Sequence, residues 1–112
     1  MSVKTEVKGD VAVIQVKGKL MGGAETDECH VCVKDFIAGG NKNIVADLSH
    51  VKWVNSKGLG MLMACFTSLK NAGGEFKIAG ATEKTKSLLM ITKLLTIFEC
   101  YDKVDEAVAS FK

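Results

Sequence analysis

Segments with a strand pattern alternate with segments with a helix pattern along most of this chain, and this alternation limits the folds that it can form. Four runs have apolar residues that are continuous or that recur at every second position, as in β-strands. These runs cover residues 3–8, 11–16, 44–48 and 75–79. A turn signal, Gly9-Asp10, separates the first two runs and predicts a β-hairpin.

Helix patterns fill most of the remaining chain. Apolar residues spaced three or four positions apart predict amphipathic helices that begin near Thr26, Ser56, Thr82 and Asp102. Thr26, Thr82 and Asp102 are the expected caps of the first, third and fourth helices, and the third is expected to end near Leu94. The segment 96–101 fits either a short fifth strand or an extended connection. The order predicts an α/β fold, with a mixed, mostly parallel sheet of four to five strands, four flanking helices and right-handed crossovers. Two-sided apolarity places Val11–Val16 and Ile44–Leu48 inside this sheet.

Length and charge exclude several classes of protein. The 112 residues fit one domain, which we place at residues 1–112. The net charge is only +2 and the basic residues are scattered, so the sequence does not support nucleic-acid binding. No apolar run approaches the roughly 18 residues that would span a membrane, and residues 1–20 lack a secretory apolar region. We therefore expect a cytoplasmic protein that binds neither nucleic acid nor membrane.

The four cysteines raise the question of a metal or redox site. Cys29 and Cys32 form a C-x-x-C motif that encloses His30, so zinc binding and a thioredoxin-type site are both alternatives. Helical spacing, however, places both thiols on the core face with Phe36 and Ile37, whereas His30 is turned away. No second pair of ligands exists in the sequence. We expect reduced structural thiols, no bound metal and no cofactor.

Residues 54–60 read Val-Asn-Ser-Lys-Gly-Leu-Gly, and they place a small hydroxyl residue where a loop becomes a long helix. A helix N-terminus has free backbone N–H groups and the positive end of the helix dipole, so it favours a phosphate or another anion. Ser56 is therefore a candidate phosphorylation site, which would gain about −1.5 to −2 charges at pH 7. The alternative is that Asn55 or Ser56 serves only as the N-cap of the helix.

Motifs of catalysis are missing from the chain. The sequence contains no G-x-S-x-G, H-E-x-x-H or G-x-x-x-x-G-K-[ST]. The Gly58-Leu59-Gly60 stretch suggests a phosphate cradle, but no glycine follows three residues later and no P-loop Lys-Ser/Thr pair is present. We predict that the protein is not an enzyme.

The stretch from Ile44 to Gly60 resembles the signature of the STAS domain in bacterial anti-sigma factor antagonists. That signature is a hydrophobic strand, Asp-Leu-Ser/Thr, an aromatic and a small apolar residue, and then Asp-Ser-Ser/Thr-Gly-Leu-Gly. Further features match in order along essentially the whole chain. They are Gly18-Lys19-Leu20, Gly73-Gly74, Gly80, and the segment 94–98 before Tyr101-Asp102.

The resemblance implies a phosphorylation switch. In this family, the serine that aligns with Ser56 is phosphorylated by a partner that is both an anti-sigma factor and a serine kinase. The unphosphorylated antagonist sequesters this partner and frees a sigma factor, so that transcription is regulated, and a metal-dependent serine phosphatase resets the phosphorylated form. The chain would then be a substrate and a protein-binding module, without catalysis of its own.

We expect the partner surface at the start of the second predicted helix and in the loop that precedes the first one. Both segments follow the ends of predicted strands, where α/β domains gather their binding groups. The residues are Gly22, Gly23, Asn55, Lys57, Gly58, Leu59 and Gly60.

Two positions depart from the family pattern. Asn55 stands where Asp is usual, and Lys57 where Ser or Thr is usual, which changes the local charge by about two units and affects recognition by a kinase. One alternative is therefore a STAS interaction module without a phosphorylation cycle, in a signalling assembly or as an accessory of lipid transport. A third interpretation is an enzyme that holds a phosphate at the helix N-terminus.

Overall fold

A computed structural model describes residues 3–111 of the chain, without the side chains of Glu25 and Leu95. The elements follow each other in the order expected from the alternation of patterns. They are β1 (Val3–Lys8), β2 (Val11–Leu20), α1 (Ala24–Ala38), β3 (Asn43–Val54), α2 (Ser56–Asn71), β4 (Glu75–Ala79), α3 (Glu83–Ile91), the 3-10 turn η1 (Leu94–Thr96), β5 (Glu99–Tyr101) and α4 (Val104–Ala109).

The strands of the described chain form one five-stranded sheet in the order β1-β2-β3-β4-β5. β1 and β2 pair antiparallel as a hairpin, and Gly9 adopts the positive φ of 63° that this tight turn requires. The other three pairings are parallel, because a helical crossover connects β2 to β3 and β3 to β4, and α3 with η1 connects β4 to β5. The predicted mixed α/β fold, with both apolar runs in interior strands, is thereby confirmed.

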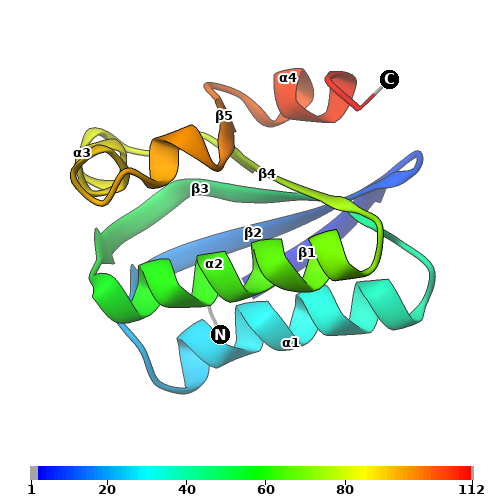
Figure 1. Cartoon of the computed structure of the whole chain (residues 1–112), viewed down its shortest axis with the longest axis horizontal. Coiled ribbons are helices and arrows are strands. Elements are labelled where there is room, and N and C mark those ends of the chain that lie inside the picture. The colour runs from blue at the N-terminus through cyan, green and yellow to red at the C-terminus, as the bar shows by residue number, and fades with distance from the viewer. Residues whose placement is uncertain (1–2, 112) are drawn as a thin grey trace.

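Helices α1 and α2 cover one face of the sheet, and α4 lies on the other (Figure 1). Side chains from α1, α2 and the facing side of the sheet form the main core, and its largest members are fully buried. These include Ile14, Leu20, Ile44, Leu48, Leu62 and Leu69. Burial of each side chain of this size contributes about 1.5–3 kcal/mol, so this interface supplies most of the hydrophobic stabilisation.

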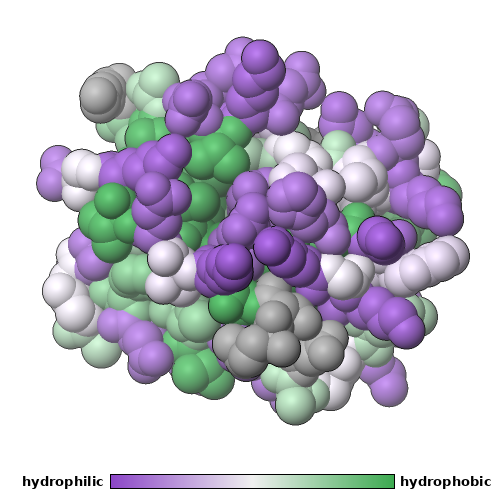
Figure 2. Space-filling view, turned by 180° about the vertical axis from the view of Figure 1, so that it is seen from behind, coloured by the Kyte–Doolittle hydropathy of each residue, from purple (hydrophilic) through white to green (hydrophobic). Residues whose placement is uncertain are grey.

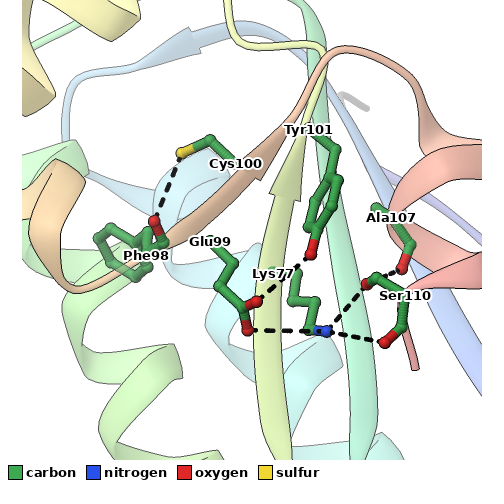
Figure 3. A network of polar contacts seen from close by, with 7 residues as sticks. All are labelled: Lys77, Phe98, Glu99, Cys100, Tyr101, Ala107 and Ser110. Atoms are coloured by element: carbon green, nitrogen blue, oxygen red, sulfur yellow. Dashed lines mark hydrogen bonds and ion pairs between the residues drawn. The ribbon is translucent and has the colours of Figure 1, made fainter. Parts of the chain in front are cut away.

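The face under α4 has a smaller core and contains charge. Val11, Val13, Val45 and Ala79 of the sheet pack there against Ala107 of α4. Lys77, which is paired with Val45 in the sheet and is only 3% exposed, lies on the same face. Its ammonium group donates a 2.8 Å hydrogen bond to Ser110 Oγ and lies 3.6 Å from Glu99 Oε2 (Figure 3). The same group lies 4.2 Å from the centre of the Phe111 ring. This lysine therefore ties the end of α4 to β4.

Hydrophilic side chains cover much of the molecule seen from behind, and apolar surface shows between them (Figure 2). No helix in the described part of the chain has both the length and the apolar character that crossing a membrane would require.

Several boundaries differ from the predicted ones. β2 and β3 extend to Leu20 and Val54, because their tails pair with each other through two register shifts after β4 has ended. The exposed residues of these tails hide the strand pattern. α3 ends at Ile91, three residues before the predicted end.

Two predicted helix caps are wrong. Gly23 is the N-cap of α1, and Thr26 lies inside the helix, where its Oγ1 accepts a 2.9 Å hydrogen bond from the Gly22 N–H. Lys103 is the N-cap of α4, whereas Asp102 forms a 3.5 Å ion pair with Lys86 instead. Thr82 caps α3 as predicted, since its side chain accepts a hydrogen bond from Thr85 N–H.

Candidate functional site

The loop between β2 and α1 meets the start of α2 at the end of the sheet where β2 and β3 terminate. Asn55 joins the two segments. Its backbone N–H donates a 3.2 Å hydrogen bond to the Leu20 carbonyl, and its side-chain Nδ2 donates a 3.1 Å bond to the Met21 carbonyl. The structure thus brings together the two parts of the chain that were expected to share one surface.

Asn55 also forms the N-cap of α2. Its Oδ1 accepts hydrogen bonds from the N–H groups of Lys57 at 3.0 Å and Gly58 at 3.1 Å, while its own backbone stays extended. These bonds satisfy two of the amides that a helix start otherwise leaves free. The choice between the two candidate caps is therefore settled in favour of Asn55, and Ser56 is the first helical residue.

Ser56 is exposed at this helix start. Within the described residues, no hydrogen bond occupies its hydroxyl group, and the first turn of α2 carries no acidic side chain. A phosphate on Ser56 would meet the positive end of the helix dipole and the cation of Lys57 in the next position. The site can therefore accommodate a dianion electrostatically.

Lys57 lies against the loop at Gly22. A methyl group at Gly22 would come within 2.8 Å of Lys57 Cδ, and Gly22 has a positive φ of 98° that side chains disfavour. The lysine stem therefore covers the glycine, while the residue as a whole remains exposed beside Ser56.

Gly58 and Leu59, two of the expected contact residues, lie below the surface. A Cβ atom at Gly58 would clash with the Leu20 carbonyl oxygen, so glycine is needed where α2 crosses β2. Leu59 is 4% exposed and belongs to the main core. These two residues position the helix start, whereas Gly22, Gly23, Asn55, Lys57 and Gly60 are exposed or half-buried at this end of the molecule.

The cysteines lie mostly in the interior. Cys29 and Cys65 are fully buried between α1 and α2. The neighbouring Cys29 thiol, together with burial, raises the pKa of the Cys65 thiol far above its usual value, and burial raises the pKa of Cys32 as well. Thiols held in the neutral form are poor nucleophiles and poor metal ligands. Residues 3–111 contain no group of three His, Cys, Asp or Glu side chains arranged around a metal position.

A groove beside the helix start was not found from the sequence. The tail of β3, residues 49–53, and the first turn of α3, residues 82–84, line a hollow of about 560 Å³. It continues into a second hollow of about 500 Å³ that reaches Leu88. Trp53 is 50% exposed between them, and Lys84 Nζ lies 4.2 Å from the centre of its ring. In the sequence, Trp53 is only the aromatic residue of the STAS signature, and its exposure depends on where β4 ends.

Comparisons with known proteins agree with the fold and with the motif. Residues 2–107 match the family model of the STAS domain. A candidate anti-sigma factor antagonist of Thermotoga maritima is 31% identical over 74 residues, and the match spans 66% of this chain and 66% of the relative.

Solved structures extend the likeness to nearly the whole chain. The crystal structure of a candidate anti-sigma factor antagonist from Thermotoga maritima superposes with a TM-score of 0.88 at 26% identity, covering 96% of this chain and 92% of that one. The phosphorylated Bacillus cell fate determinant SpoIIAA superposes with a TM-score of 0.78 at 15% identity, covering 99% and 100%. At this identity, the second likeness shows the fold alone.

Proposed function

Because this chain belongs to the STAS domain family, we propose that it is an anti-sigma factor antagonist. In this role the module, a single domain over residues 1–112, binds an anti-sigma factor in the cytoplasm, and the sigma factor that this partner had held becomes free to direct transcription. The name of the Thermotoga maritima relative supports the role. The observation that carries the proposal is the exposed Ser56 at a capped helix start, next to the loop at Gly22.

The binding is switched by phosphorylation of Ser56. The partner is both anti-sigma factor and serine kinase, and it docks on the start of α2 and on the loop at Gly22 and Gly23. An exposed neutral hydroxyl fits such an interface, whereas a phosphate brings about −1.5 to −2 charges that must be desolvated there. The phosphorylated form therefore dissociates, and a serine phosphatase restores the binding form.

Asn55 and Lys57 change the local charge around the phosphorylated serine. Asn55 retains the capping bonds that an aspartate would make but carries no charge beside the phosphorylated serine. Lys57 supplies a cation next to the phosphate and offsets part of the repulsion. We infer a weaker electrostatic switch than in a relative with Asp and Ser at these positions.

A STAS interaction module without a phosphorylation cycle is the second candidate. The observation that favours it is the Lys57 side chain, whose stem packs on Gly22 immediately beside Ser56 and adds bulk where a kinase must approach. In this case the same surface would join a signalling assembly or a lipid-transport complex.

Incubation with the anti-sigma factor kinases of the same genome and ATP tests the proposal. Mass spectrometry should find one phosphate on wild-type protein and on Thr67→Ala, which lacks an exposed hydroxyl farther along α2, and none on Ser56→Ala. Titration calorimetry should then show that unphosphorylated protein and Ser56→Ala bind the partner and that phosphorylated protein does not. Absence of binding to every such kinase would refute the antagonist role. Equal affinity of both forms would refute the switch and leave the second candidate.

A further inference from the structure

The two halves of β3 have different neighbours. Residues 43–47 pair with β2 on one side and with β4 on the other, but β4 ends at Ala79, opposite Asp47. At this point the Asp47 carboxylate accepts a 3.0 Å hydrogen bond from the Ser49 N–H, and Gly80 turns the chain away with a φ of 68°. Among the described residues, the tail of β3 from His50 to Val54 pairs only with β2.

This tail therefore has a free edge. In a strand, backbone N–H and C=O groups point alternately to the two sides, so every second residue of the tail directs a donor and an acceptor away from β2. α3 runs beside this edge but leaves the groove of about 560 Å³ between them. A strand edge faced by a helix across an open groove is the arrangement in which an extended peptide adds to a sheet.

The side chains of the groove select the chemistry of such a peptide. Trp53 offers a half-exposed aromatic surface, and Leu88 continues it along α3. Lys52 and Lys84 are exposed cations on opposite walls of the groove, against the single carboxylate of Glu83. The groove thus combines a free edge, an apolar surface and an excess of positive charge.

We propose that the free edge of β3 and the facing side of α3 form a second docking site, which takes an extended, acidic segment of a partner protein as an added β-strand. Acidic residues of the segment pair with Lys52 and Lys84, and its apolar residues cover Trp53. A second copy of this chain is a poorer occupant, because antiparallel pairing of two such edges around Lys52 brings like charges together. The site adjoins Ser56 but does not contain it, so the inference does not depend on the phosphorylation switch.

The only tryptophan of the chain reports on this groove directly. We would titrate the full chain with a synthetic peptide of alternating glutamate and valine and follow Trp53 fluorescence. The emission should shift to shorter wavelength as the ring is covered. The same peptide with lysine in place of glutamate should bind at least about tenfold more weakly. A glutamate-valine peptide with an N-methyl group on every residue has no backbone N–H to donate on either edge, so it cannot pair with β3 and should not bind.

Matched charge reversals locate the site. Lys84→Glu should weaken binding of the acidic peptide about tenfold. Lys42→Glu changes the net charge equally in the loop before β3, at the far end of the strand, and should leave binding unchanged, as should Ser56→Asp. Amide exchange of residues 50–54 should slow when the peptide is bound.

Four results would overturn the proposal. Equal binding of the acidic and basic peptides would show that Lys52 and Lys84 do not select the peptide. Undiminished binding of the N-methylated peptide would show that the peptide does not pair with the edge of β3. A dimer that is detected by sedimentation and competes with the peptide would identify a second copy as the occupant. Loss of peptide binding in Ser56→Asp would place the peptide on the surface at Ser56 instead, whereas failure of the kinase experiment leaves this site intact.

Discussion

The two faces of the sheet are covered in different ways. α1 and α2, with 15 and 16 residues, pack against one face through large aliphatic side chains. α4 has 6 residues and packs against the other face through a small cluster of buried residues. Both buried charged side chains of the described chain, Asp47 and Lys77, lie on the α4 face, where Asp47 pairs with Ala79 and Lys77 with Val45.

The two faces therefore differ in how much they stabilise the fold and in how firmly they hold their helices. The main core holds α2 in a fixed place on the sheet, so the helix start that bears Ser56 is positioned by the most strongly buried part of the molecule. α4 is held by a few apolar contacts and by the polar network of Lys77, so it should open at a lower free energy than the rest.

The largest effect should come from truncation of the main core. Leu62 is fully buried in α2, and Leu62→Ala should lower the free energy of unfolding by about 2–5 kcal/mol through lost burial and a cavity. Val104→Ala in α4, where the side chain is only half-buried, should cost about 1 kcal/mol or less. Urea denaturation would measure both. Equal losses would mean that the two faces contribute alike.

Two glycines of α2 provide a matched pair for the position of the helix. Gly58→Ala places a methyl group on the Leu20 carbonyl and should cost about 1–3 kcal/mol or shift the helix start. Gly60→Ala, whose new methyl group meets nothing within 4 Å, should instead stabilise the protein by about 0.5–1 kcal/mol through helix propensity. Thermal unfolding measured on both variants checks the opposite signs. A gain in stability for Gly58→Ala would show that α2 is not fixed against β2.

Removal of the Lys77 side chain should affect α4 locally. Lys77→Ala loses the bond to Ser110 and the contact with Phe111, and it should cost about 1–2 kcal/mol. Hydrogen exchange should accelerate in α4 and remain slow in α2. Lys77→Met, which keeps most of the stem without the charge, should retain α4 protection better than alanine does. Uniform acceleration over the whole chain would indicate that α4 opens only with global unfolding.

The smallest effect should be a pH dependence of stability that arises where α1 packs against α2. His30 on α1 lies 3.3 Å from Ser68 Oγ on α2, and burial, followed by the charge of Lys34, lowers its pKa below 6.5. Because the folded state disfavours the charged imidazole, His30 contributes its full stability above the unfolded pKa, and this contribution is lost as the pH falls below 6.5. His30→Gln should lose less stability than wild type between about pH 7.5 and about pH 5.5. The denaturation midpoints of both proteins at the two pH values measure this difference in stability loss. Identical losses would show that His30 is not its source.

The sequence predicted the fold well where buried apolar residues recur in a regular pattern along the chain. Val11–Val16 and Ile44–Leu48 are largely apolar on both faces because α1 and α2 cover one face of the sheet and α4 covers the other, and this produces a recognisable pattern. The tails of β2 and β3 lack it, because Lys17, Lys19 and Lys52 face solvent while the backbone remains paired. Helix caps were less predictable, because Gly23 and Lys103 occupy cap positions without a side-chain hydrogen bond.

The sequence predicted which segments form the candidate site, but not which of their residues are buried and which are exposed. The glycines of a signature look alike in sequence, yet Gly58 is buried against Leu20 and Gly60 is exposed. The groove at Trp53 depends on the end of β4 and on the course of α3, and neither is encoded near the tryptophan in the chain. Long-range packing therefore decided which residues of the motif reach the surface.

The order of the strands in the sheet, which follows their order in the chain, also bears on how the protein assembles during synthesis. No strand has to insert between two that emerged earlier, so each new strand can add to the growing edge of the sheet. The segment from β2 to the end of α2 contains the whole helix start with Ser56 and its supporting loop. The ribosome thus releases every part of this helix start and its supporting loop before it releases β5 and α4, and chains can organise from the N-terminal side first during synthesis.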